Sequence, residues 1–146
     1  MTRVVIMQGT PGAGKSSWIA RALPGAVVVS ADHHFMRDGA YHFDPAGLGE
    51  AHAQCMRRFL DALGSGADTV VVDNTSPRVS DLSPYYSVAR AFNAPVDVVR
   101  VVCDPKVAAA RNVHGVPAAA VERIAASLEE PPPFWACEFM VVTQAA

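Results

Sequence analysis

Residues 9–16 read GTPGAGKS, and their types and spacing suit the binding of phosphate. The segment matches the pattern G-x-x-x-x-G-K-[ST] at its fixed positions, Gly9, Gly14, Lys15 and Ser16. Glycines let the backbone curl so that successive N–H groups point at phosphate oxygens, and a following helix adds the positive end of its dipole. The segment therefore predicts a site for a nucleoside triphosphate, against the alternative of an ordinary glycine-rich turn with a surface lysine.

The individual positions of this loop have separate expected roles. Lys15 is expected to reach the β- and γ-phosphates, and the hydroxyl of Ser16 is expected to bind Mg²⁺. ATP is expected rather than GTP, because the guanine-reading pattern N-K-x-D does not occur in the sequence. The residues expected to bind the nucleotide are Gly9, Thr10, Pro11, Gly12, Ala13, Gly14, Lys15, Ser16, Ser17 and, from farther along the chain, Arg111.

The elements that must position the loop alternate along the chain. Five apolar runs predict strands, at residues 3–7, 26–29, 69–72, 96–102 and 139–143. Helices are expected between them, at residues 16–23, 44–64, 80–92, 104–112 and 117–128. Continuous apolar strands are typical of a parallel sheet covered on both faces. We predict one α/β domain over residues 1–146, a P-loop NTPase fold with strand order 2-3-1-4-5 and an arginine-bearing lid.

Polar residues follow three of the predicted strands. Ligands bind at the carboxyl ends of the strands in an open parallel sheet. Asp32 follows the second strand and is the candidate general base for a phosphotransfer reaction, the alternative being a turn cap. Asp73 ends the run TVVVD as a Walker B acid does, and is expected to hold Mg²⁺ or to contact the acceptor. Asn74 is a candidate for acceptor binding or a turn residue, and Asp104, which precedes a proline, is expected to cap a helix.

Several basic side chains could complete such a site. Arg111 lies in the segment KVAAARNVHGVP and is expected to close over ATP as a lid residue, where its guanidinium would offset charge on the transferred phosphoryl group. Arg37 and Arg78 follow the second and third strand segments and are candidates for contacting the acceptor. Arg57 and Arg58 are interpreted as a solvated helix face, with acceptor binding as the lesser alternative.

Histidines gather close to Asp32 in the sequence. His33, His34 and His42 are interpreted as loop residues near the acceptor, with a metal site as the lesser alternative. His114, near Arg111, is expected to have a structural role rather than to donate a hydrogen bond to phosphate.

The motifs in this order resemble the small P-loop kinases related to the 5′-kinase domain of phage polynucleotide kinase. The resemblance rests on GTPGAGKSSW (9–18), SAD (30–32), FDPAGLGEAH (43–52), VVVDNT (70–75) and RNVHGVP (111–117), and it runs from residue 1 to about residue 129. It implies that Lys15, Ser16 and Asp73 serve the nucleotide, that Asp32 is the general base, and that Arg111 contacts ATP. The chain departs from the phage enzyme at Phe35, where that enzyme has an arginine for the acceptor's phosphate, and it lacks that enzyme's second lid arginine.

Composition limits the remaining possibilities. The net charge of −2 provides no global basic field for a polyanion, so a nucleic acid would need a local groove of arginines. The three cysteines form no CxxC motif, and no run is long enough for a signal peptide or membrane span, so a cytoplasmic location is expected.

The leading hypothesis is an ATP- and Mg²⁺-dependent phosphotransferase acting on the 5′-hydroxyl of a polynucleotide or on a hydroxyl of a modified DNA base. The alternatives are a kinase for a nucleoside, sugar or antibiotic, and a non-catalytic ATP-binding module.

Overall fold

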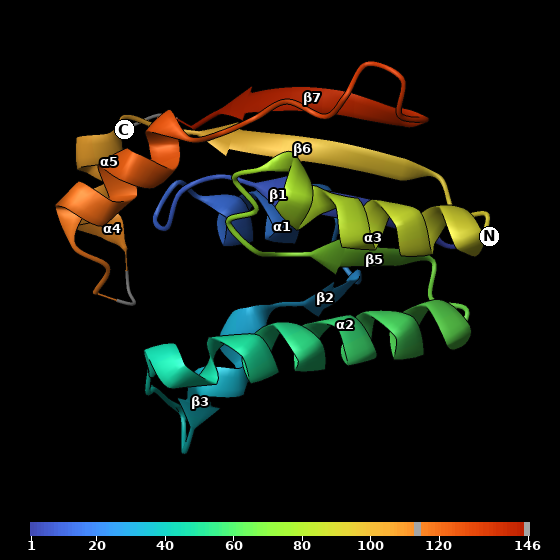
Figure 1. Cartoon of the computed structure of the whole chain (residues 1–146), viewed down its shortest axis with the longest axis horizontal. Coiled ribbons are helices and arrows are strands. Elements are labelled where there is room, and N and C mark those ends of the chain that lie inside the picture. Colours follow the sequence, from blue (N-terminus) through green and yellow to red (C-terminus); the bar gives the residue numbers. More distant parts are fainter. Residues whose placement is uncertain (113–114, 145–146) are drawn as a thin grey trace.

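The five predicted strands form one parallel sheet in the computed structural model, which describes residues 1–112 and 115–144 (Figure 1). The strands are β1 (Arg3–Gln8), β2 (Val27–Val29), β5 (Thr69–Val72), β6 (Val96–Val102) and β7 (Cys137–Thr143). They stand in the order β2-β5-β1-β6-β7, with every neighbouring pair parallel. Counted along the chain, this is the predicted order 2-3-1-4-5.

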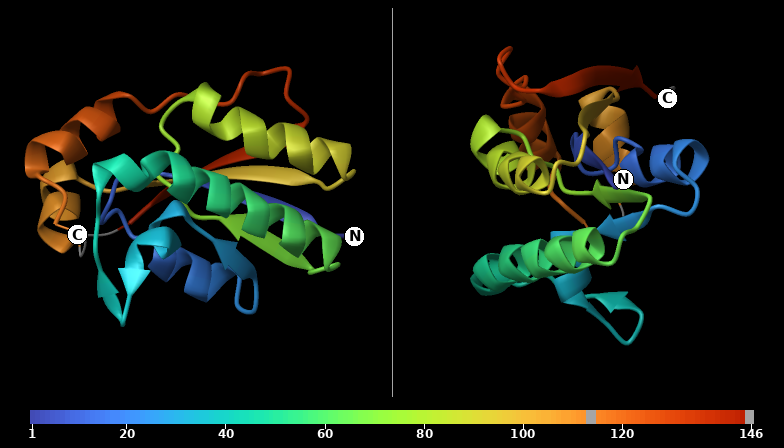
Figure 2. Two further views of the ribbon diagram at one scale, coloured as in Figure 1. Left: turned by 60° about the horizontal axis from the view of Figure 1, so that its bottom comes forward. Right: turned by 90° about the vertical axis from the view of Figure 1, so that its right-hand side faces the viewer.

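Helices cover both faces of the sheet, as predicted. The longer helices, α2 (Leu48–Gly64) and α3 (Val79–Ala91), lie on one face, and α1 (Lys15–Ala22) lies on the opposite side from α3 (Figure 2). Two short helices, α4 (Pro105–Arg111) and α5 (Ala118–Ala126), pack against each other beyond the carboxyl ends of the strands (Figure 1). A membrane-spanning segment is not found among the helices that the structure describes.

The central strand β1 explains why residues 4–7 are apolar without interruption. Its alternate residues Val4 and Ile6 enter the core beneath α2 and α3, where Phe59 is fully buried. Its other residues, Val5 and Met7, enter the core on the α1 side. Because successive strand side chains point to opposite faces, a strand covered on both sides must be apolar at every position.

Several helix boundaries differ from the predictions. Asp44 caps the single turn η2 (Pro45–Gly47), accepting a hydrogen bond from the Ala46 N–H at 3.0 Å, and α2 begins only afterwards. The helix predicted from residue 80 begins at Val79, where the carboxylate of Asp81 accepts from the Arg78 N–H at 3.0 Å. A carboxylate at the third helical position can fill the capping role from inside the helix.

Two further predictions concern the ends of helices. The third helix was predicted to reach residue 92, but α3 ends at Ala91 and the Phe92 side chain is 49% exposed. Asp104 was predicted to cap a helix, and its carboxylate does accept from the Lys106 N–H at 2.8 Å at the start of α4.

The segment predicted to be irregular, residues 33–43, carries regular structure. It contains the 3-10 turn η1 (Ala31–Phe35) and an antiparallel hairpin of β3 (Met36–Arg37) and β4 (Ala40–Tyr41). Asp38 and Gly39 adopt positive φ at the tip of the hairpin. An aspartate and a glycine tolerate this conformation in a two-residue turn, so DG was the available sequence signal.

The buried side chain of Gln8 fixes the chain at the point where it enters the glycine loop. Its Nε2 donates to the carbonyls of Glu129 (2.8 Å), Ser76 (3.1 Å) and Pro77 (3.3 Å), and its Oε1 accepts from Arg100 Nε at 2.7 Å. One amide therefore joins β1, β6, the loop after β5 and the segment after α5.

We expect Gln8→Leu to lower the free energy of unfolding by about 3 kcal/mol, because several buried polar groups lose their partner. Urea denaturation of the two proteins measures this difference. Gln144→Leu is the matched control, since the Gln144 side chain accepts an exposed hydrogen bond from Arg21 at 3.4 Å, and it should cost less than about 0.5 kcal/mol. Equal stabilities for the two variants would contradict the role of Gln8.

Candidate active site

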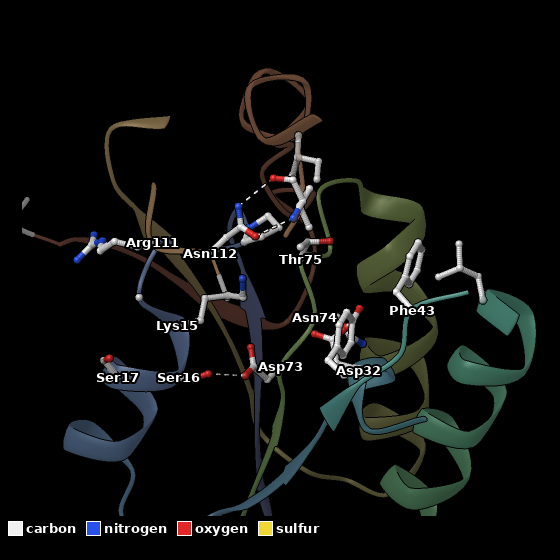
Figure 3. A pocket seen from close by; sticks show the side chains of 17 residues that line it. Lys15, Ser16, Ser17, Asp32, Phe43, Asp73, Asn74, Thr75, Arg111 and Asn112 are labelled. Atoms are coloured by element: carbon white, nitrogen blue, oxygen red, sulfur yellow. Dashed lines mark hydrogen bonds between the residues drawn. The ribbon is translucent and has the colours of Figure 1, made fainter. Parts of the chain in front are cut away.

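A cavity of about 550 Å³ lies at the carboxyl ends of the central strands. Figure 3 shows it with Lys15 and Asp73 near its centre, Arg111 on one side and Asp32 and Phe43 on the other. The described residues that line it are Pro11, Gly12, Gly14, Lys15, Ser16, Ser17, Asp32, Tyr41, Phe43, Leu48, Asp73, Asn74, Thr75, Arg111, Asn112, Val116 and Ile124.

The glycine loop joins β1 to α1 and needs glycine at two left-handed positions. Gly12 has φ +79°, and a Cβ atom there would collide with the carbonyl oxygen of Ala108 in α4. Gly14 has φ +103° and immediately precedes the first turn of α1. The loop backbone thus packs directly on α4, and Gly12, Gly14 and the start of α1 line the cavity.

The ammonium group of Lys15 lies against the loop itself. Its Nζ donates to the carbonyls of Gly9 and Thr10, both at 3.0 Å. Burial lowers the pKa of Lys15, and the carboxylates of Asp73 and Asp32 oppose that shift. A buried cation whose main partners are neutral carbonyls would gain strongly from a phosphate anion.

Asp73 and Ser16 face each other at the foot of the cavity. The Ser16 hydroxyl donates to Asp73 Oδ2 at 3.4 Å (Figure 3). Burial raises the pKa of Asp73, partly offset by Lys15 and by the hydrogen bond from Ser16. A hydroxyl and a carboxylate are hard oxygen ligands of the kind that Mg²⁺ prefers, so this donor pair fits the expected metal.

Asp32 is held by the elements around it rather than by its own helix. Ser30 precedes η1, and its Oγ accepts from the Asp32 N–H at 3.1 Å. Asn74 Oδ1 accepts from the Ala31 N–H at 2.9 Å, which ties the segment after β2 to the segment after β5. The predicted acceptor residue Asn74 therefore has a positioning role while it also lines the cavity.

Tyr41 on β4 orients the Asp32 carboxylate. Its hydroxyl donates to Asp32 Oδ1 at 3.1 Å. Burial and the neighbouring Asp32 raise the pKa of Tyr41 to about 12, so the phenol stays protonated and remains a donor at neutral pH. A fixed carboxylate at the cavity wall suits the acceptance of a proton from a substrate hydroxyl.

Arg111 ends α4 and lines the cavity on the side of Lys15 away from Asp32 (Figure 3). Its Nη2 donates to Cys103 Sγ at 3.0 Å. The next residue, Asn112, both accepts from the Val116 N–H at 2.8 Å and donates to the Val116 carbonyl at 2.9 Å. These bonds tie Asn112 to Val116, and both residues line the cavity.

The two predicted acceptor arginines are not brought to the cavity. Arg37 lies on the exposed strand β3, and Arg78 precedes α3; neither is among the described lining residues. Arg57 pairs with Glu50 at 2.6 Å on an exposed face of α2, as the solvated-face interpretation expected.

The predicted histidine cluster does not form a metal site in the structure. His34 Nδ1 contacts Gln54 Oε1 at 3.0 Å, which ties η1 to α2. Within residues 1–112 and 115–144, no three His, Cys, Asp or Glu side chains are grouped to hold a metal. His114, expected to be structural, lies outside the described residues.

Sequence reasoning missed the residues opposite the glycine loop. Tyr41 and Phe43 fall between the predicted strand at residues 26–29 and the predicted helix at residues 44–64, and Ile124 falls within the helix predicted over residues 117–128. The signal for the aromatic pair was present, because Tyr41 and Phe43 alternate along an extended segment close to Asp32. The lining residues not predicted are Tyr41, Phe43, Leu48, Thr75, Asn112, Val116 and Ile124.

Comparison with protein families gives a match over most of the chain. A family model described as an AAA domain matches residues 4–131. NEDD4-binding protein 2 from Homo sapiens is 33% identical over 123 residues, which cover 77% of this chain and 7% of that protein. The chain therefore spans a small part of the length of this curated relative.

Solved structures share the fold. A candidate kinase from Chloroflexus aurantiacus has a TM-score of 0.66 at 18% identity, covering 97% of this chain and 88% of that one. The APS kinase of Mycobacterium tuberculosis, in complex with AMPPNP and APS, has a TM-score of 0.60 at 20% identity, covering 99% and 90%. At these identities the likeness shows the architecture, which agrees with the predicted P-loop fold.

We expect Gly12→Ala to weaken nucleotide binding and to destabilise the fold, because its methyl group would displace α4 from the glycine loop. Gly25→Ala is a matched control, since Gly25 has φ +81° but no heavy atom within 4 Å of the added Cβ. The control should lose only about 1 kcal/mol from its left-handed backbone. Urea denaturation and calorimetric titration with ATP compare the two, and equal losses would contradict the packing of the loop on α4.

We expect Asp73→Asn to be more stable than the parent at pH 7 and to bind Mg²⁺·ATP more weakly. Burial holds the pKa of Asp73 above 3.8, so the folded chain binds this proton more tightly than the unfolded chain does. The free energy of unfolding of the parent therefore falls as pH rises through the raised pKa of Asp73. The side-chain amide that the variant carries at this position does not ionise, so the variant does not lose this stability.

Urea denaturation across a pH series measures this effect. The difference between the variant and the parent should disappear below pH 3.8, where both chains carry a neutral group. Asp61→Asn on the exposed face of α2 serves as the control. A variant no more stable than the parent at pH 7 would contradict the predicted burial effect.

Proposed function

The chain belongs to the AAA-domain family matched over residues 4–131, and from that premise we propose that it is an ATP- and Mg²⁺-dependent phosphotransferase that moves the γ-phosphate to a hydroxyl acceptor. The observation that carries the proposal is one cavity with the loop lysine, Lys15, on one side and the oriented carboxylate of Asp32 on the other. Phosphoryl transfer needs a cradle for the triphosphate and a proton acceptor facing it, and both groups are present.

The reaction follows from the positions of the side chains. Lys15 exchanges its carbonyl partners for β- and γ-phosphate oxygens, where its charge is compensated. Asp32 takes the proton from the acceptor hydroxyl as that oxygen bonds to the γ-phosphorus and the bond to the β–γ bridging oxygen breaks, leaving ADP. Arg111 supplies positive charge at the nucleotide side. Bound Mg²⁺, held by Ser16 and Asp73, would neutralise charge on the phosphate oxygens.

The acceptor can be drawn from two classes. The motif resemblance to polynucleotide kinases supports the 5′-hydroxyl of a polynucleotide, or a hydroxyl on a modified DNA base. The placement of Arg37 and Arg78 away from the described cavity lining favours a small-molecule acceptor instead. The structurally similar APS kinase, which carries APS as its ligand, acts on a small molecule by its name. A screen of both classes with γ-labelled ATP decides between them.

A non-catalytic ATP-binding module is the third possibility, and Asp32 tests it directly. We expect Asp32→Asn to reduce transfer from γ-labelled ATP to acceptor by roughly 10²–10⁴-fold, because the proton acceptor is lost. The affinity for ATP should be nearly unchanged, since Asp32 lies on the acceptor side of the cavity.

Asp38→Asn is the matched control, an exposed aspartate at the tip of the β3–β4 hairpin. Its transfer rate should equal that of the parent. The kinase proposal would be wrong if Asp32→Asn left the transfer rate unchanged. It would also be wrong if the parent bound ATP tightly but transferred phosphate to none of the acceptors.

The three cysteines are free thiols in the structure, which supports the expected cytoplasmic location.

A further inference from the structure

The half of the cavity beyond Asp32 has the chemistry of a site for a planar, uncharged molecule. Resting on the phosphotransferase proposed above, we infer that the acceptor is an uncharged alcohol that carries a planar ring, as a nucleoside does. Its hydroxyl meets Asp32, and its ring lies on the aromatic pair Tyr41 and Phe43. The acceptor half, as we define it, comprises Tyr41, Phe43 and Leu48.

A buried aromatic ring packs against both members of the aromatic pair. Phe35 is 4% exposed and meets Tyr41 edge-on at 6.0 Å and Phe43 edge-on at 5.2 Å between ring centroids. Tyr41 and Phe43 are nearly parallel to each other, at 10° and 6.4 Å. Two rings held in one orientation by a buried third ring present a preformed platform for stacking.

The platform lines the cavity and is partly open to solvent. Phe43 is 51% exposed and Leu48 is 40% exposed, although both are large apolar side chains. Tyr41 also bonds the Asp32 carboxylate, so one residue joins the platform to the proposed base. A ring stacked on the pair would therefore bring a hydroxyl on the same molecule toward Asp32.

The charges of the cavity argue against a phosphate on the acceptor. Among the described lining residues, the cations are Lys15 and Arg111, and Figure 3 shows Arg111 on the far side of Lys15 from Phe43. In the acceptor half, the Tyr41 hydroxyl donates to the carboxylate of Asp32. A 5′-hydroxyl at a polynucleotide end carries a phosphate on the same sugar, and in the acceptor half that phosphate would lie near this carboxylate with no cationic residue among those that define this half.

A second aromatic pair does not offer a competing platform. Tyr86 and Trp135 stack on each other at 4.1 Å and 3°, and the Tyr86 hydroxyl accepts from the Ala136 N–H at 2.8 Å. Neither residue is among the described residues that line the cavity. Their faces are used within the fold, so the acceptor half is the place where a ring can stack close to Asp32.

The test is a set of acceptors that share one 5′-hydroxyl and differ in one group each. Thymidine, thymidine 3′-monophosphate, 2-deoxyribose locked as its methyl furanoside (hereafter 2-deoxyribose) and a 5′-hydroxyl oligothymidylate are offered separately with γ-labelled ATP and Mg²⁺. We expect the highest kcat/KM for thymidine, with at least about tenfold losses on adding the 3′-phosphate and on removing the base. Higher kcat/KM for the oligothymidylate or the 3′-monophosphate would overturn the inference, as would equal use of 2-deoxyribose.

Phe43→Leu tests the platform. KM for thymidine should rise at least about fivefold, because base stacking is lost, while KM for 2-deoxyribose changes less than twofold. Phe92→Leu is the matched control, since Phe92 is 49% exposed at the end of α3 and does not line the cavity. Equal changes for both acceptors, or for both variants, would overturn the role of the platform.

Leu48→Arg tests the charge argument as a gain of function. A guanidinium in the acceptor half should raise kcat/KM for thymidine 3′-monophosphate relative to thymidine by at least about fivefold. Leu60→Arg, on the same helix and equally exposed at 40%, should leave that ratio unchanged. An unchanged ratio in Leu48→Arg would overturn the charge argument.

The outcomes separate this inference from the proposed function. Asp32-dependent labelling of the oligothymidylate alone would overturn the acceptor class and leave the phosphotransferase intact. Failure to label any acceptor, with ATP bound, would overturn both proposals.

Discussion

The burial of Lys15 among carbonyls and carboxylates is the constraint on which this structure depends. An ammonium group taken out of water must be compensated, and here two loop carbonyls and the charges of Asp73 and Asp32 provide the compensation. Asp73 is itself destabilised by burial and relieved by Lys15 and Ser16. The site is therefore a set of mutually dependent charges that a bound nucleotide and metal would complete.

The surrounding fold holds these charged groups at fixed positions. The parallel sheet brings the ends of β1, β2 and β5 to one edge, because strands joined by helices on its faces all point the same way. Side-chain amides then connect the loops at that edge. Gln8 joins the start of the glycine loop to the segments after β5 and α5, and Asn74 joins the segments that carry Asp73 and Asp32.

The cavity combines two kinds of chemistry on either side of Asp32. The glycine loop, Lys15 and Arg111 offer N–H groups and positive charge, as a triphosphate requires. The opposite side offers aromatic and aliphatic surface around Tyr41 and Phe43, supported by the buried ring of Phe35. Phe35 stands where the resembling phage enzyme has an arginine, and it supports an aromatic platform in this chain.

The sequence alone determined the features whose cause is local. The loop motif, the five apolar strands and the cap at Asp104 depend on spacing and on nearest neighbours, and the strand order followed from the fold that the motif predicts. Only the tertiary structure decided which distant residues meet. Packing placed Arg37 and Arg78 away from the cavity lining, turned Asn74 into a tie between two loops, and brought Tyr41 and Phe43 beside Asp32. These contacts depend on how a hairpin and two helices pack against the sheet, and the spacing of residues along the chain does not specify that packing.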